Sequence, residues 1–279
     1  MGVTYNLILG GGASLPTTLN VTVSGGTATT VTASLGSRSV SLAYDSTSAL
    51  WSAALPKNAT GNWTVTATGG SKTVSDLVAI SGPGIWSMEL ALGPLPSGYT
   101  QLEYIESTGT QYIDAGVSNV NGAVITFQYT SITNNTSVFG ARNTEGGSSR
   151  FGLTIFNGGW HFMPPGISYG VADTSKHTVQ MGSIASWKSI LDDTEYGTAT
   201  RDYSSISTYL FAEHFYTRGV LLLAALRIFE AKLYQDAPLV RDFIPARRNS
   251  DSAVGMYDTV TQTFYTNAGS GTFIAGPDV

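Results

Sequence analysis

Hydrophobic and polar residues alternate along the first part of the chain. Segments such as LNVTVSG (Leu19 to Gly25) and NWTVTAT (Asn62 to Thr68) place apolar side chains at every second position, the pattern of a half-buried β-strand. Turn formers such as Gly69-Gly70 separate these segments. We expect strands at Leu19 to Gly25, Thr30 to Gly36, Arg38 to Tyr44, Ala49 to Leu55, Asn62 to Thr68 and Thr73 to Ile80. Strands that recur about every ten residues predict an immunoglobulin-like sandwich.

Alternation continues through the second part of the chain. We expect strands there at Thr100 to Glu106, Gln111 to Ala115, Ala123 to Ser131, Thr136 to Ala141, Arg150 to Phe156, Gly159 to Met163, His177 to Met181, Ala185 to Leu191, Ser207 to Phe215, Leu221 to Gln235 and Leu239 to Pro245. An antiparallel set of this size predicts a double-sheet jelly roll. Helix should be minimal, because no segment sustains an apolar period of about 3.6 residues.

The junction between these parts is rich in proline and glycine. SGPGIWSMELALGPLPSG, from Ser81 to Gly98, surrounds one strand-like piece, Ile85 to Leu92, and residues of these two types break regular strand pairing. We therefore expect two all-β domains, residues 1–93 and 94–279. The piece Ile85 to Leu92 fits either a linker or the last strand of the first domain.

Composition narrows the function classes. Charged residues make up only 12% of the chain and there is no cysteine, which excludes disulfides and thiolate metal sites. Neither part has the basic stripe that nucleic acid requires. Membrane insertion is not expected, because the longest aliphatic run, Val220 to Leu226, is far shorter than the ~20 residues of a spanning helix. The start, MGVTYNLILGGG, lacks the pattern of a secretory signal.

Motifs in the second part resemble a known family. LEYIESTGTQYIDAG near the start is followed late in the chain by RIFEAKLY, LVRDFIPAR and GMYDTVTQTFYTNAGSGTF. In this order they resemble the concanavalin A-like (laminin-G-like) jelly-roll domains of phage tail and fibre proteins and of some gut-bacterial surface proteins. WTVTATGGSKTVSDLVAI in the first part resembles the transthyretin- or carboxypeptidase-regulatory-like modules of phage structural proteins.

The resemblance implies a phage virion protein of the tail, fibre or head decoration, exposed outside the cell after release. Its C-terminal domain would bind a bacterial surface glycan and its N-terminal domain other virion proteins. A homo-oligomer is expected, with a trimer as first guess and a pentamer or monomer as alternatives. The alternative is a secreted bacterial adhesin or carbohydrate-binding module, and after it a glycan hydrolase.

Enzyme motifs are weak, and we expect no enzyme. Glu103-x-x-Glu106 would send its carboxylates to opposite faces of a strand, and Asp193-x-Glu195 falls in a predicted hairpin turn, SILDDTEYGT. GISYG (Gly166 to Gly170) matches the serine-hydrolase pattern by letter, but no helix follows it, so we interpret it as a loop.

Metal sites have little support in the spacing. The histidines, His161, His177 and His214, have no second ligand at zinc spacing. No cofactor is expected, although the family resemblance leaves calcium open. Its candidate ligands are Asp114, Asp173, Asp192, Asp193 and Asp258.

Aromatic residues are the best indication of a binding site, because sugars stack on aromatic rings. NGGWHFMPPGISYG concentrates Trp160, His161 and Tyr169 in a Gly- and Pro-rich stretch. Trp187 and Tyr216 complete the set of candidate ligand-binding residues. Alternation places Trp160 on one face of its strand and His161 on the other, so Trp160 is either a ligand platform or a core residue.

Overall fold

The computed structural model describes residues 16–69, 72–96, 98–143, 149–164, 166–198 and 204–279. Nearly all regular structure in these residues is β-strand, and their only helix is one short 3-10 turn, η1 (Ser183–Ala185). The strands pair almost entirely antiparallel, so the predicted all-β class is confirmed. None of the helical structure described is long and apolar enough to cross a bilayer.

The chain divides into two compact units. Unit 1 runs to Gln101 and includes Val279, and unit 2 runs from Leu102 to Asp278. The division therefore falls after the predicted boundary between residues 93 and 94, because the chain continues in unit 1 beyond its last long strand.

Unit 1 contains two four-stranded sheets, in the orders β4-β5-β1-β8 and β3-β2-β6-β7. The strands of these sheets are β1 (Thr18–Ser24), β2 (Thr30–Leu35), β3 (Arg38–Ser41), β4 (Ala43–Asp45), β5 (Leu50–Ala54), β6 (Gly61–Gly69), β7 (Lys72–Ile80) and β8 (Ile85–Ala91), and the short β9 (Tyr99–Gln101) belongs to neither sheet. On β6 the alternation buries Trp63, Val65 and Ala67, which join buried residues of the other sheet in one core.

Two details of unit 1 refine the prediction. The segment Arg38 to Tyr44 forms two strands, β3 and β4, that belong to different sheets. The chain passes from one sheet to the other at Leu42, whose side chain is buried. The piece at Ile85 is a strand of unit 1: β8 pairs in parallel with β1, from Thr18 opposite Ile85 to Ser24 opposite Ala91.

Unit 2 has a larger sheet and a smaller one. The larger follows the order β19-β18-β17-β12-β23-β24-β25-β26, with β10 beside β23 and β27 beside β10. Its strands are β10 (Ile105–Thr108), β12 (Gly122–Tyr129), β17 (Lys176–Gly182), β18 (Lys188–Leu191), β19 (Thr194–Thr198), β23 (Ala225–Tyr234), β24 (Leu239–Arg248), β25 (Val254–Asp258), β26 (Thr263–Thr266) and β27 (Ile274–Ala275).

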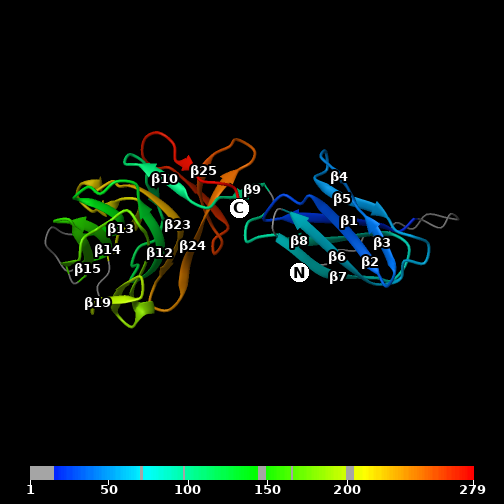
Figure 1. The fold of residues 1–279 in the computed structure, drawn as a ribbon, viewed down its shortest axis with the longest axis horizontal. Helices are drawn as coiled ribbons and strands as arrows, with labels where there is room; N and C mark the ends of the chain where they lie inside the picture. The colour runs from blue at the N-terminus through cyan, green and yellow to red at the C-terminus, as the bar shows by residue number, and fades with distance from the viewer. Residues whose placement is uncertain (1–15, 70–71, 97, 144–148, 165, 199–203) are drawn as a thin grey trace. The chain divides into compact units, whose positions relative to one another are not determined.

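The smaller sheet follows the order β11-β20-β13-β14-β15-β16, with β21 beside β13 and β22 beside β21. Its strands are β11 (Ile113–Asp114), β13 (Thr136–Arg142), β14 (Arg150–Phe156), β15 (Gly159–Met163), β16 (Ile167–Tyr169), β20 (Tyr209–Leu210), β21 (Glu213–Phe215) and β22 (Gly219–Leu221). The two sheets form facing layers (Figure 1). Their inner side chains share one core, in which the rings of Phe127 and Trp160 lie 5.7 Å apart.

Local differences from the prediction in unit 2 have physical causes. The interpretation of GISYG as a loop was wrong, because Ile167–Tyr169 pairs with β15 as strand β16. The segment Ala185 to Leu191 begins in η1 and becomes a strand only at Lys188. The predicted acidic hairpin turn is confirmed: Asp192 (φ 48°) and Asp193 (φ 65°) are both left-handed, as a tight two-residue turn requires.

Candidate functional site

A pocket lies on the outer face of the smaller sheet of unit 2. The inward side chains of β14, such as Phe151 and Leu153, belong to the core. At outward positions Gly140 of β13 faces Gly152 of β14 across the strand ladder. Both glycines are nevertheless buried, and the space that a side chain at Gly140 would take is bordered by Glu213.

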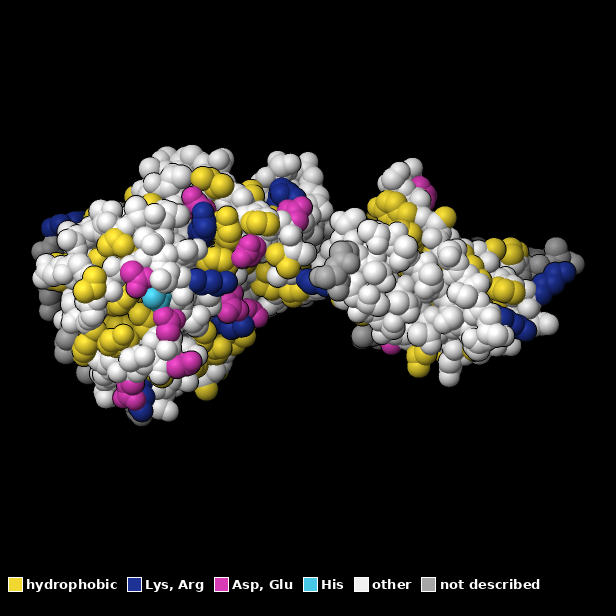
Figure 2. Space-filling model, in the orientation of Figure 1, with side chains coloured by type: hydrophobic (Ala, Val, Ile, Leu, Met, Phe, Trp, Pro, Cys, Tyr) yellow, Lys and Arg dark blue, Asp and Glu magenta, His cyan; other side chains and the backbone are white. Residues whose placement is uncertain are grey.

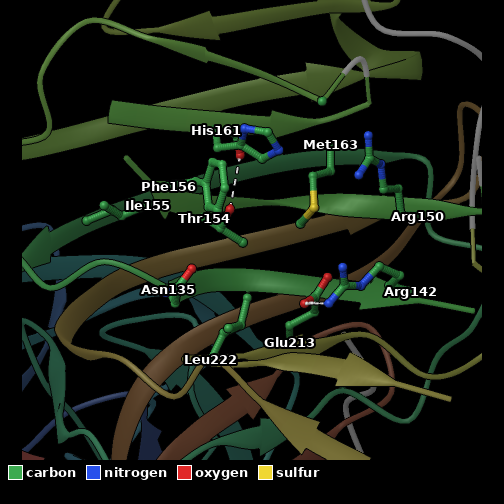
Figure 3. A pocket seen from close by; sticks show the side chains of 11 residues that line it. Asn135, Arg142, Arg150, Thr154, Ile155, Phe156, His161, Met163, Glu213 and Leu222 are labelled. Atoms are coloured by element: carbon green, nitrogen blue, oxygen red, sulfur yellow. Dashed lines mark hydrogen bonds and ion pairs between the residues drawn. The ribbon is translucent and has the colours of Figure 1, made fainter. Parts of the chain in front are cut away.

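The pocket has a volume of about 330 Å³ and two chemically different ends. Arg142 and Arg150 lie at one end, whereas Ile155 and Phe156 lie at the other (Figure 3). The ring of Phe156 is 45% exposed, so an apolar surface is accessible there. A pocket of this kind offers an aromatic face together with a small number of polar groups, which is the usual composition of a ligand site.

Glu213 is the buried charge of the pocket. Its side chain is fully buried, lies 3.4 Å from the position that a Cβ at Gly140 would take, and accepts a 3.0 Å bond from Arg142 Nη2 to Oε2. Burial raises the pKa of Glu213 above the usual 4.5, and the charges of Arg142 and Arg150 oppose this shift.

Two buried polar atoms of this ion pair lack a hydrogen-bond partner: Glu213 Oε1 and Arg142 Nε. Leaving such an atom unsatisfied costs about 1–3 kcal/mol, so native proteins seldom do so without a reason. Both atoms belong to side chains that line the pocket. They therefore provide an acceptor and a donor that a ligand entering the pocket can use.

His161 contributes an uncharged polar group. Its Nδ1 lies 2.9 Å from Ser168 Oγ on β16, and its ring is 5.4 Å from that of Phe156. Burial lowers the pKa of His161 below 6.5, and the charges of Arg150 and Arg142 lower it further. The imidazole is consequently neutral at pH 7, with one nitrogen donating and the other accepting.

The structure brings only one of the aromatic candidates into this pocket, namely His161. Trp160 is only 3% exposed and faces the core, which was the other interpretation of its position. Tyr169 is half-buried against Phe162 and Tyr196, with ring centroids 6.1 and 5.5 Å apart.

The remaining two candidates stand apart from the pocket lining. Trp187 is partly buried in the turn after η1, and Tyr216 is 68% exposed just after β21. A ligand-binding role for Trp187 or Tyr216 stays a prediction, whereas the burial of Trp160 removes its ring from the outer face.

Three of the candidate calcium ligands contact basic side chains of the protein. Asp173 and Asp192 both contact His177, at 3.0 and 2.5 Å. Asp258 is buried beside Arg241 at 3.6 Å. Within the described ranges no three His, Asp or Glu side chains gather closely enough to hold a metal ion.

A second cavity, of about 350 Å³, lies on the outer face of the larger sheet, where Thr178 and Gln180 border it together with Asp192 and Asp193. Two of the four carboxylates considered for hydrolysis are engaged in ion pairs: Glu195 with Lys188 at 2.7 Å, and Glu106 with Arg227 at 2.6 Å. No described carboxylate besides Glu213 lines the first pocket, so that pocket lacks the pair that glycoside hydrolysis uses.

Sequence reasoning did not single out Arg142, Arg150 or Glu213. A signal was nevertheless present, because Gly140 and Gly152 interrupt strand patterns, and Glu213 stands in the apolar run YLFAEHF. What the sequence did not reveal was that these positions share one face.

Comparison with protein-family models, curated proteins and solved structures found no match to this chain. The functional interpretation therefore rests on the site itself and on the motif resemblance.

Proposed function

We propose that the chain is a structural protein of a phage particle (tail, fibre or head decoration) whose unit 2 binds a bacterial surface glycan in the pocket between Phe156 and Arg150. The observation that carries glycan binding is the unused hydrogen-bonding capacity of Glu213 Oε1 and Arg142 Nε beside the exposed ring of Phe156. A sugar supplies hydroxyl groups for the first two and an apolar C–H face for the third.

The facing sheets of unit 2 support its assignment as a concanavalin A-like jelly roll, and the two four-stranded sheets of unit 1 support an immunoglobulin-like sandwich. The phage context comes from the motif resemblance and does not depend on the pocket. Immunogold labelling of purified particles tests it: particles without label would favour a secreted adhesin or carbohydrate-binding module.

Glycan binding is tested with the full chain on an array of bacterial glycans. We expect binding that Phe156→Ala weakens about tenfold or more, since stacking on an aromatic ring contributes on the order of 1–3 kcal/mol. The matched control is Phe264→Ala, which changes an aromatic residue on β26 of the other sheet. An array on which the chain binds nothing contradicts the proposal.

Unit 1 is proposed to attach the protein to other subunits, as a homotrimer in the first instance. Three of its large exposed apolar side chains, Tyr44, Leu77 and Ile85, lie on edge strands, β4, β7 and β8. Charged residues, which guard edges against pairing, are scarce on its visible face and gather instead on unit 2 (Figure 2). Light scattering should give an oligomer for the full chain and a monomer for a chain beginning at Leu95.

A further inference from the structure

Two arginines occupy directly opposite positions at the end of the β13–β14 hairpin. Arg142 and Arg150 are cross-strand partners, and both line the pocket. Like charges placed opposite each other destabilise an antiparallel pair. The arrangement is therefore unfavourable by itself and becomes favourable when negative charge lies between or beside the two guanidinium groups.

Glu213 supplies such charge to one arginine only. Its Oε2 pairs with Arg142, whereas Arg150 has no carboxylate or hydrogen-bond partner within the described residues. The Arg150 guanidinium lies against Gly166, whose φ of 86° and lack of a side chain leave space for it; a Cβ at Gly166 would overlap Arg150 Nη2. Arg150 thus lies at the pocket without a carboxylate partner among the residues that the structure describes.

The charges that face the pocket do not cancel. The described titratable residues of its lining are Arg142, Arg150, His161 and Glu213. His161 is neutral at pH 7 because of its lowered pKa, and the single carboxylate faces two guanidinium groups. The described lining of the pocket therefore carries net positive charge in a protein whose overall charge is −5. An anionic ligand would find attraction here and repulsion over most other surfaces.

We propose that the glycan bound in this pocket is acidic: Arg150 binds its carboxylate, sulfate or phosphate group, and Glu213 Oε1 accepts a hydrogen bond from one of its hydroxyls. This inference rests on the proposed glycan binding. Guanidinium groups bind such anions with two parallel hydrogen bonds, which adds both affinity and orientation. The arginine end then receives the acidic group, while the opposite end, at Phe156, receives the C–H face of the sugar.

The experiment compares matched sugars that differ only in charge. Methyl glucuronide, methyl glucoside 6-sulfate, methyl glucoside 6-phosphate and methyl glucoside are titrated into the full chain by calorimetry, with the galactose series in parallel. We expect at least one acidic sugar to bind ten times more tightly than its neutral parent. Comparison of the glucuronide with the sulfate and phosphate esters identifies which anion the pocket prefers. Equal binding of acidic and neutral sugars overturns this inference and leaves glycan binding intact. Binding of none overturns both.

A pair of variants locates the anion. Arg150→Gln should lower the affinity for the acidic sugar about tenfold, equivalent to ~1.4 kcal/mol, and leave the neutral sugar unaffected. Arg38→Gln makes the same change in unit 1, where Arg38 donates to the Asn58 carbonyl, and should alter neither affinity. Equal losses in both variants would mean that only the overall charge matters, and would contradict binding at Arg150.

His161 reports on the same event independently of affinity. A bound anion favours the charged imidazole, so the acidic sugar should raise the pKa of His161 in an NMR titration, whereas the neutral sugar should not. The chain has three histidines, and the signal is assigned with His161→Gln. A His161 pKa that stays unchanged with the acidic sugar bound would place the anion outside this pocket.

Discussion

The two histidines beside Trp160 show how differently one polar side chain is used between the two sheets of unit 2 and on the outer face of the smaller one. His177 lies inside, with its ring 5.0 Å from that of Trp160 and both of its nitrogens facing carboxylates, of Asp192 and Asp173. His161, the residue after Trp160, faces outward beside a buried carboxylate oxygen and a buried guanidinium nitrogen that have no partner.

This difference separates a stabilising cluster from a binding site. Both ring nitrogens of His177 lie within hydrogen-bond distance of a carboxylate, so the hydrogen-bonding capacity of the ring is filled within the protein. Asp173 is held further by the backbone N–H of Ser175, which lowers the pKa of its carboxyl group. In the pocket that His161 lines, Glu213 Oε1 and Arg142 Nε have no hydrogen-bond partner, so a ligand can bind to them.

The largest loss of stability is expected when Trp160, which lies next to both histidines, is replaced. Trp160→Ala removes a ring packed against Phe127, Tyr129 and His177, so unfolding should become easier by about 3–5 kcal/mol. Urea denaturation measures the change. A loss below about 1 kcal/mol would show that Trp160 is not the core residue that its burial indicates.

His177→Ala should have the next largest effect, about 2–3 kcal/mol of stability, because it removes a buried ring and leaves Asp173 and Asp192 without their shared partner. Sugar affinity should not change, since His177 is not part of the pocket lining. Calorimetry on the folded variant checks this point. Loss of binding with intact folding would mean that the two sites are coupled.

Glu213→Gln tests the buried carboxylate through pH. Because its pKa is raised in the folded state, Glu213 contributes stability below pH 4.5, and this is lost as the pH rises through the folded value. The variant should therefore match the wild type at low pH and become the more stable protein towards neutrality. Denaturation curves over this range measure the difference, and the opposite trend would show that the Arg142 pair dominates.

The smallest effect on stability is expected for His161→Gln, within ~0.5 kcal/mol at pH 7.5. The pKa of His161 is lowered in the folded state, so the wild type should lose stability relative to the variant as the pH falls through 6.5. Thermal unfolding at several pH values measures this. A loss of stability as large as that of His177→Ala would show that His161, like His177, has a mainly structural role.

Strand periodicity predicted most of the architecture because it depends on local sequence. It placed β6, β14 and β15 nearly to the residue, and it assigned Trp160 and His161 to opposite faces. The pocket was not predictable in this way. Glu213 and Arg142 meet through the parallel pairing of β21 with β13, and a pairing between distant segments leaves no periodic trace in either of them.

The parallel pairing of β1 with β8 has a mechanical consequence. Thr18, at the start of β1, and Ala91, at the end of β8, lie at opposite ends of the same strand pair. A force that pulls Thr18 and Ala91 apart acts on the two strands in opposite directions along their length. The backbone hydrogen bonds between β1 and β8 are then loaded together in shear and do not open one after another. A strand pair arranged in this way resists extension along the direction of its strands.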